Sequence, residues 1–67
     1  MIKFWKSYKN KEVYDIKQKR HGVLKEVVSS PIITYPIYIE YEDETGRSYS
    51  LDAASRYLIL KEWSKGK

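Results

Sequence analysis

The stretch from Tyr35 to Asp52 constrains the fold of this chain most, because its residues alternate as they do in a β-hairpin. Asp43-Glu44-Thr45-Gly46 has the composition of the connecting turn, in which Gly46 can take a left-handed conformation at no steric cost. The face expected to point inward carries Tyr35, Ile37, Ile39 and Tyr41 on the first strand and Tyr49 and Leu51 on the second. The outward face carries Pro36, Tyr38, Glu40 and Glu42. This pattern predicts a small β protein but specifies no reaction.

A further strand is predicted near the N-terminus. Residues 12–18 alternate, with Tyr14 and Ile16 on one face. The following Lys19-Arg20-His21-Gly22 is expected to be a turn, with Gly22 as its break point. We therefore expect this strand to turn back and pair with the segment that follows.

That next segment, residues 23–29, is rich in residues that favour β-structure, but its apolar side chains do not share one face of a flat strand. A bulge near Lys25 and Glu26 would bring Leu24 and Val27 to the same side. Bent strands of this kind are needed to close small barrels. Ser29-Ser30-Pro31 is expected to be a loop leading toward the hairpin, because Pro31 cannot donate to a ladder.

The C-terminal third allows two interpretations. A single helical turn at residues 53–57, followed by a strand at 58–63, is the preferred one. The alternative is an α+β fold with a C-terminal helix over residues 52–65, for which Asp52 is a suitable N-cap. The apolar run 58–60 fits either structure, because short apolar runs are ambiguous by periodicity alone.

Sixty-seven residues predict a single domain, with a basic aromatic segment at 1–11, a barrel at 12–63 and a tail at 64–67. Seven Tyr and two Trp suit an all-β, five-stranded small barrel that fills its interior with a few large side chains. The absence of Cys excludes disulfides and thiolate metal sites. No segment is apolar enough to predict a signal peptide or a bilayer span, so a cytoplasmic protein with no membrane association is expected.

Charge is distributed unevenly along the chain. Residues 1–25 carry eight basic and two acidic side chains, whereas residues 26–52 carry one basic and six acidic ones. Residues 53–67 carry four basic side chains and one acidic one. If the two ends of the chain meet in space, the molecule is a dipole rather than a uniform cation of net charge +4.

Three short motifs together resemble a known group of proteins. They are Gly22-Val23-x-x-x-Val27, Tyr35-Pro36-Ile37-x-Ile39-x-Tyr41 and Ser48-Tyr49-Ser50-x-Asp52. Over residues 13–60 this pattern is similar to short phage and prophage proteins with an SH3-like barrel, although Ala53 stands where that group usually has Gly. The resemblance implies a five-stranded SH3-like barrel with one helical turn before the last strand and an origin in a mobile element. It implies no activity.

Enzyme chemistry has little support in the residues present, and we expect neither a catalytic site nor a cofactor. His21 is the only histidine, and it lies in a turn beside two cations. No evident base partner for nucleophilic catalysis accompanies Ser29, Ser30, Ser48, Ser50 or Ser55. The acidic side chains of the hairpin do not have the spacing of a calcium loop, so no metal site is expected either.

Two kinds of binding remain. The first is docking on a protein partner, here a host or defence protein that a phage-type accessory protein would modulate. The residues expected to make that contact are Tyr38, Glu40, Glu42, Asp43 and Glu44. Two readings of Tyr38 stay open, namely an exposed aromatic contact and a side chain that Phe4 or Trp5 covers.

The alternative is a nucleic-acid-binding barrel that uses its basic aromatic N-terminal half, with lysines on phosphates and aromatic rings on bases. Its expected contacts are Lys3, Trp5, Lys6, Tyr8, Lys9, Lys11, Lys17, Lys19 and Arg20. The competing interpretation is a solubilising basic shell with the aromatic rings buried in the core. A third interpretation is a self-associating structural module that pairs through an exposed strand edge. The expected oligomeric state is a monomer or a weak homodimer.

Overall fold

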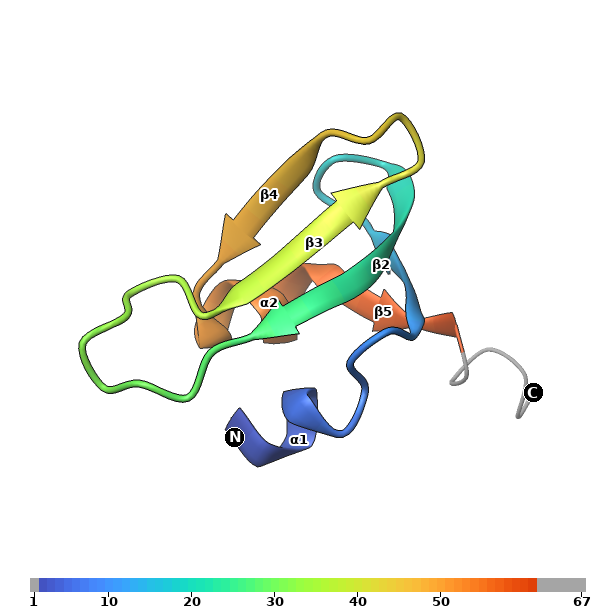
Figure 1. The fold of residues 1–67 in the computed structure, drawn as a ribbon. Coiled ribbons are helices and arrows are strands. Elements are labelled where there is room, and N and C mark those ends of the chain that lie inside the picture. Colours follow the sequence, from blue (N-terminus) through green and yellow to red (C-terminus); the bar gives the residue numbers. More distant parts are fainter. Residues whose placement is uncertain (1, 62–67) are drawn as a thin grey trace.

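A computed structural model describes residues 2–61 as a mostly β structure with two short helices (Figure 1). Five antiparallel strands form one sheet in the order β4-β3-β2-β1-β5. In chain order the elements are α1 (Ile2–Lys6), β1 (Glu12–Asp15), β2 (Arg20–Val27), β3 (Ile37–Tyr41), β4 (Gly46–Tyr49), α2 (Leu51–Tyr57) and β5 (Leu58–Leu60). The five predicted strands and the helical turn before the last of them are therefore confirmed. The predicted tail at 64–67 lies outside the described residues.

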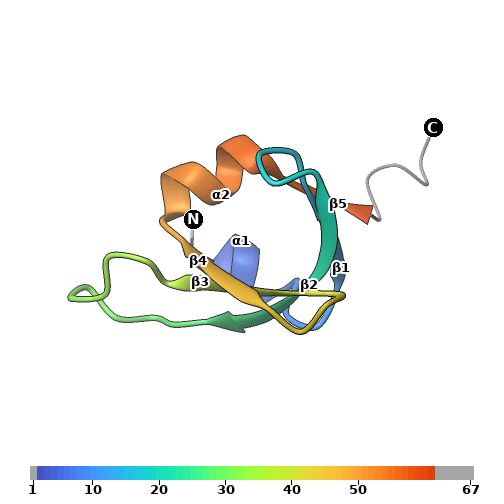
Figure 2. The ribbon, with the colours of Figure 1, turned by 90° about the horizontal axis from the view of Figure 1, so that it is seen from above.

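The sheet curls strongly but remains open. Seen from above, its strands follow an arc, and α2 lies in the gap between the edge strands β4 and β5 (Figure 2). Within the described residues β4 pairs only with β3, and β5 pairs only with β1. The hydrogen bonding therefore shows a curled open sheet and does not show a closed barrel.

The bend in β2 comes from the predicted bulge. The pairing of β2 with β3 shifts its register between Leu24 and Glu26. This shift leaves both Leu24 and Val27 buried, although they are three residues apart and would face opposite sides of a regular strand. The bulge thus lets one strand contribute to the inside of the curl along its whole length.

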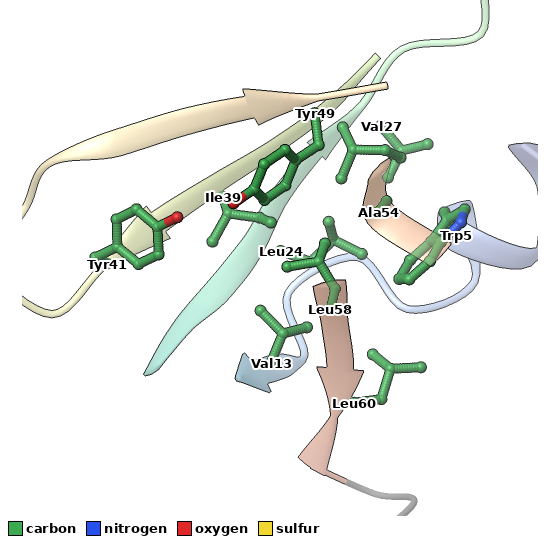
Figure 3. Packing of buried hydrophobic residues seen from close by; sticks show 11 residues of the cluster. Trp5, Val13, Leu24, Val27, Ile39, Tyr41, Tyr49, Ala54, Leu58 and Leu60 are labelled. Carbon is green, nitrogen blue, oxygen red and sulfur yellow. The ribbon is translucent and has the colours of Figure 1, made fainter. Parts of the chain in front are cut away.

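The core fills the inside of the curl and includes the N-terminal helix. Trp5 of α1 is only 1% exposed and packs with side chains from the sheet and from α2 (Figure 3). The buried cluster consists of Trp5, Val13, Leu24, Val27, Ile37, Ile39, Tyr41, Tyr49, Ala54, Leu58 and Leu60. The basic aromatic segment is consequently part of the folded core and not an appendage to it.

The turn between β1 and β2 differs from the expectation. Gly22 lies within β2 rather than in the turn, and the left-handed conformation belongs to Lys19, with φ 58°. A Cβ atom at Gly22 would lie 2.8 Å from the carbonyl oxygen of Glu40 on the neighbouring strand. Glycine is therefore needed here for a close approach of two strands and not for a turn.

The hairpin turn also uses a different residue from the one expected. Glu44 takes the left-handed conformation, with φ 69°, whereas Gly46 has no positive φ and begins β4. A Cβ atom at Gly46 would overlap the ring and hydroxyl of Tyr38. Here glycine makes room for the side chain of the opposite strand.

At the C-terminal end, α2 is followed directly by β5, so the alternative helix over residues 52–65 is wrong for its described part. Its N-cap is Ser50 rather than Asp52, because the Ser50 hydroxyl accepts a hydrogen bond from the backbone N–H of Ala53 at 3.1 Å. The strand ends at Leu60, and residues 62 and 63 of the predicted strand lie outside the described residues.

Two predicted faces need correction. Tyr35 is 61% exposed and precedes β3, so it does not belong to the inward face of the hairpin, and Pro36, predicted on the outward face, is buried. In β1 the alternation holds, with Val13 and Asp15 buried, but the strand ends at Asp15 and not at residue 18, so Ile16 lies in the turn. Leu51 begins α2 and is only partly buried against the core.

Candidate binding surfaces

The only buried charged side chain among the described residues is Asp15, at the end of β1. Its Oδ2 atom accepts hydrogen bonds from the hydroxyls of Tyr41 and Tyr49, each at 2.5 Å. Its Oδ1 atom accepts from the backbone N–H groups of Lys17 and Gln18, at 2.9 and 3.1 Å. The two tyrosine side chains point toward each other inside the curl (Figure 3). One carboxylate therefore ties β1 to β3 and β4 across the interior.

The proton affinities of this cluster follow from its burial and its hydrogen bonds. Burial alone would raise the pKa of Asp15, but the two tyrosine hydroxyls and two backbone N–H donors more than offset it, so the pKa lies below its ordinary value. Burial and the hydrogen bond to Asp15 raise the pKa of both Tyr41 and Tyr49. A charged carboxylate and two neutral phenols are therefore the stable protonation state. Both carboxylate oxygens of Asp15 already accept two hydrogen bonds each from the protein, so we assign this cluster to the stability of the fold and not to a ligand.

The acidic hairpin tip is less negative than its sequence indicates. Arg20 of β2 forms a salt bridge with Asp43, and its guanidinium also lies 4.4 Å from the centre of the Tyr41 ring. Hydrogen bonds from the side chain and backbone of Thr45, together with Arg20, lower the pKa of Asp43. Glu40 lies 3.7 Å from the ammonium group of Lys25. Of the predicted acidic contacts, Glu42 and Glu44 are the exposed ones for which the structure gives no ion pair.

Tyr38 lies on the outward face, as predicted, and is 39% exposed. Its ring crosses to the neighbouring strand and covers Gly46, which leaves part of the ring in contact with protein. Trp5 packs into the core on the inside of the curl, so it does not cover Tyr38. Tyr38 is consequently available to a partner, but as a single ring beside polar side chains.

The basic residues predicted to bind nucleic acid do not form one surface. Trp5 is buried in the core, so the prediction that it stacks on bases is wrong. Lys9 pairs with Glu26 at 3.4 Å, near the end of β2. Arg20 lies at the opposite end of β2, six residues before Glu26 along the strand.

The other predicted contacts divide between these two ends. Tyr8 packs partly against the core, and Lys17 lies with its ammonium 5.1 Å from the centre of the Tyr57 ring. The remaining lysines are exposed, with Lys3, Lys6 and Lys11 in the N-terminal segment and Lys19 in the turn after β1. The distribution favours scattered surface charge over a continuous phosphate-binding track.

The most prominent surface feature is one that sequence reasoning missed as a site. Eight large apolar side chains are exposed among the described residues, and five of them fall within residues 28–38: Val28, Ile32, Ile33, Tyr35 and Tyr38. Residues 28–36, which we call the apolar loop, project from the sheet at the end opposite the hairpin turn (Figure 1). Ile32 is 86% exposed. The uncharged run Ser-Ser-Pro-Ile-Ile-Thr-Tyr-Pro, without strand-like alternation, was the signal that could have identified it.

An apolar groove of about 410 Å³ opens between this loop and the two helices. We call it the loop groove, and it is lined by Ile2, Val28, Ser29, Ser30, Pro31, Ile33, Pro36 and Leu51. A second hollow of about 260 Å³ lies on the sheet between β1, β2 and β3, with polar residues such as Glu12, His21 and Glu40 in its lining. Across residues 2–61 no three acidic or histidine side chains gather in a way that could hold a metal ion.

No protein-family model, curated protein or solved structure matches this chain. Within the described part of the chain, neither helix has the length and apolarity required to cross a bilayer.

Proposed function

We propose that this protein is a non-catalytic module that docks on another protein through the apolar loop and modulates it by covering part of its surface. The observation that carries the proposal is the concentration of exposed large apolar side chains in residues 28–38, which hold five of the eight among the described residues. Exposed apolar patches on small soluble proteins mark interaction sites, because leaving them in water is unfavourable. Aromatic and aliphatic side chains at the centre of such patches contribute most to affinity.

The apolar loop is a better docking surface than the acidic hairpin tip. Asp43 and Glu40 at the tip are engaged by Arg20 and Lys25, so a partner would have to compete with contacts that already exist. The side chain of Ile32 is almost fully exposed, so binding a partner would disrupt few existing contacts within the chain. Tyr38 lies two residues after the loop in sequence, in β3, and we include it in the proposed contact.

An SH3-like fold and a phage-type role form part of this proposal. The strand order, the bulged second strand and the helix directly before the last strand support an SH3-like arrangement, in which α2 fills the gap between the edge strands. Small barrels of this kind bind many classes of partner, so the fold does not choose among them. Because the motifs of this chain resemble those of phage and prophage proteins, we propose a host or defence protein as the partner.

The proposal can be tested by affinity capture from host-cell lysate, with and without nuclease treatment. The variant Ile32→Ser with Ile33→Ser removes the apolar surface, and we expect it to lose most of the captured partner. Ile16→Ser is the matched control, because Ile16 is 42% exposed and Ile33 41%, yet Ile16 lies in the turn after β1. Tyr38→Ala should weaken capture to a smaller extent.

Three results would contradict the proposal. Equal capture by the loop variant and the control would show that the apolar loop is not the contact. Capture that nuclease treatment abolishes, with binding to DNA or RNA that weakens steeply with salt, would establish the nucleic-acid alternative instead. Failure of the wild-type chain to retain any protein above a blank resin would remove the docking role itself.

A further inference from the structure

The loop groove has an uncharged floor and a basic border. No residue from 27 to 39 is charged, so the loop side of the groove contributes only apolar side chains, hydroxyls and backbone. The helix on its other side, α1, contributes Ile2 to the lining and carries Lys3 and Lys6 one helical turn apart. No acidic residue occurs between positions 1 and 11.

Lys6 joins the basic border directly to the groove. Its ammonium group donates a hydrogen bond to the hydroxyl of Ser29, a lining residue, at 3.4 Å. Both side chains are exposed, so the ammonium keeps further donors for a group that arrives from solvent. A lysine held at the mouth of an apolar groove is well placed to contact a carboxylate next to an inserted apolar side chain.

The acidic residues closest in sequence to the lining residues Val28 and Leu51 are each paired with a basic side chain. Glu26, at the end of β2, pairs with Lys9 at 3.4 Å. Asp52, in the first turn of α2, pairs with Arg56 at 3.3 Å. Lys6 therefore gives the groove a basic border, with Lys3 one helical turn before it on α1, although the middle third of the sequence as a whole is acidic.

We infer that the loop groove binds an acidic, amphipathic segment of the partner protein, with a bulky apolar side chain on its floor and carboxylates against Lys3 and Lys6. This inference rests on the proposed docking function and specifies the chemistry of the partner. The volume of about 410 Å³ is at the small end of the roughly 300–1,000 Å³ range of ligand sites, which suits one or two apolar side chains rather than a whole helix face. Charge complementarity selects acidic sequences and rejects basic ones.

Selection from a random peptide-display library, with the full chain as bait, tests this inference. We expect enriched peptides to share a bulky apolar residue flanked by Asp or Glu. A synthetic peptide of that consensus should bind Lys6→Glu several-fold more weakly than wild type and should bind Lys19→Glu as well as wild type. Lys19 is the matched control because it is an exposed lysine at the other end of β2. Binding should also weaken as salt is raised.

The failures of the two proposals are distinguishable. Enriched peptides that are basic or uncharged, but still lost with Ile32→Ser and Ile33→Ser, would overturn the acidic segment and leave docking through the loop intact. Equal loss of affinity in Lys6→Glu and Lys19→Glu would overturn it too. If the enriched peptides bind the variant Ile32→Ser with Ile33→Ser as well as wild type, or if no peptide is enriched, both proposals are overturned. Vesicles of phosphatidylcholine with phosphatidylserine serve as a further probe, and binding to them through the loop would replace the protein segment with a lipid surface.

Discussion

The two ends of the sheet differ in what they bury, because one buries a charged side chain and the other leaves large apolar side chains exposed. Near the β1–β2 turn, Asp15 is fully buried and makes four hydrogen bonds, two of them to tyrosine hydroxyls. At the other end, Ile32 and its neighbours in the apolar loop leave large apolar side chains in water. The Asp15 cluster stabilises the fold although burying a charge is unfavourable, whereas the apolar loop leaves exposed side chains whose burial would have added stability.

This contrast separates residues that hold the fold from residues that are free to bind. In a chain of 67 residues the core is small, and few apolar side chains can be left outside it without a loss of stability. In the polar cluster around Asp15 the hydrogen-bonding groups are already paired with one another, so none is left for a ligand. An exposed apolar loop has capacity but adds little to folding. The comparison predicts that substitutions at the two ends have different consequences.

The largest effect on stability is expected from Asp15→Ala. This change leaves two buried tyrosine hydroxyls and two backbone N–H groups without their acceptor, and we expect it to lower the free energy of unfolding by about 3 kcal/mol. Urea denaturation followed by circular dichroism measures the change. A loss below about 1 kcal/mol, the usual worth of one ordinary hydrogen bond, would contradict a central role for this cluster.

A combined variant separates the hydrogen bonds from the shape of the side chain. Adding Tyr41→Phe and Tyr49→Phe to Asp15→Ala removes the orphaned hydroxyls together with their acceptor. Because replacing both partners by apolar groups can be nearly neutral, part of the lost stability should return. If the triple variant is less stable than Asp15→Ala, packing rather than hydrogen-bond satisfaction governs this end of the sheet.

The same cluster predicts a loss of stability at both extremes of pH. The folded-state pKa of Asp15 is below its ordinary 3.8, so its contribution is present above that pH and disappears as the pH falls through the folded value. The folded-state pKa values of Tyr41 and Tyr49 are above 10.0, so stability is retained below that pH and declines as the pH rises beyond it. Urea midpoints measured across pH should therefore fall at both ends. Tyr41→Phe with Tyr49→Phe should flatten the alkaline decline, and an unchanged slope would contradict the assignment.

The smallest effect on stability is expected in the apolar loop. Ile32→Ser changes a side chain that is 86% exposed, so the free energy of unfolding should stay within about 0.5 kcal/mol of wild type. Binding to the partner should nevertheless fall, and affinity measurements beside urea denaturation separate the two. A loss of stability comparable to that of Asp15→Ala would show that the loop belongs to the folding core and would remove the contrast.

Much of the fold followed from local patterns. The alternation around Ile37 and Ile39 and the order of apolar residues near Lys25 each predicted an element that the structure contains. The apolar run at 58–60 was compatible with a strand or a helix, and the structure makes it strand β5. Period-two alternation determines such elements because it decides which side chains are buried together. The turns were less predictable. Glycine is needed at positions 22 and 46 because a larger residue would clash with a neighbouring strand, and a local sequence pattern carries no information about such contacts.

The candidate surfaces were harder to predict, for the same reason. Trp5 lies in a basic segment whose composition indicates a nucleic-acid contact, but in the structure its large apolar side chain is buried in the core. Arg20 and Asp43 lie far apart in sequence and meet only because β2 and the hairpin turn adjoin. The apolar loop looked like a connection into the hairpin, and its exposure becomes visible only once the core is known to be filled without it.

The central claim is that the apolar loop is the docking surface. A photo-crosslinking amino acid in place of Ile32, in the full chain, tests it most directly when compared with the same residue in place of Ile16. We expect irradiation in lysate to yield one predominant protein adduct from position 32 and none from position 16, and we expect unlabelled wild-type chain to compete it away. Equal labelling from the two positions, or an adduct from position 16 alone, would contradict the account.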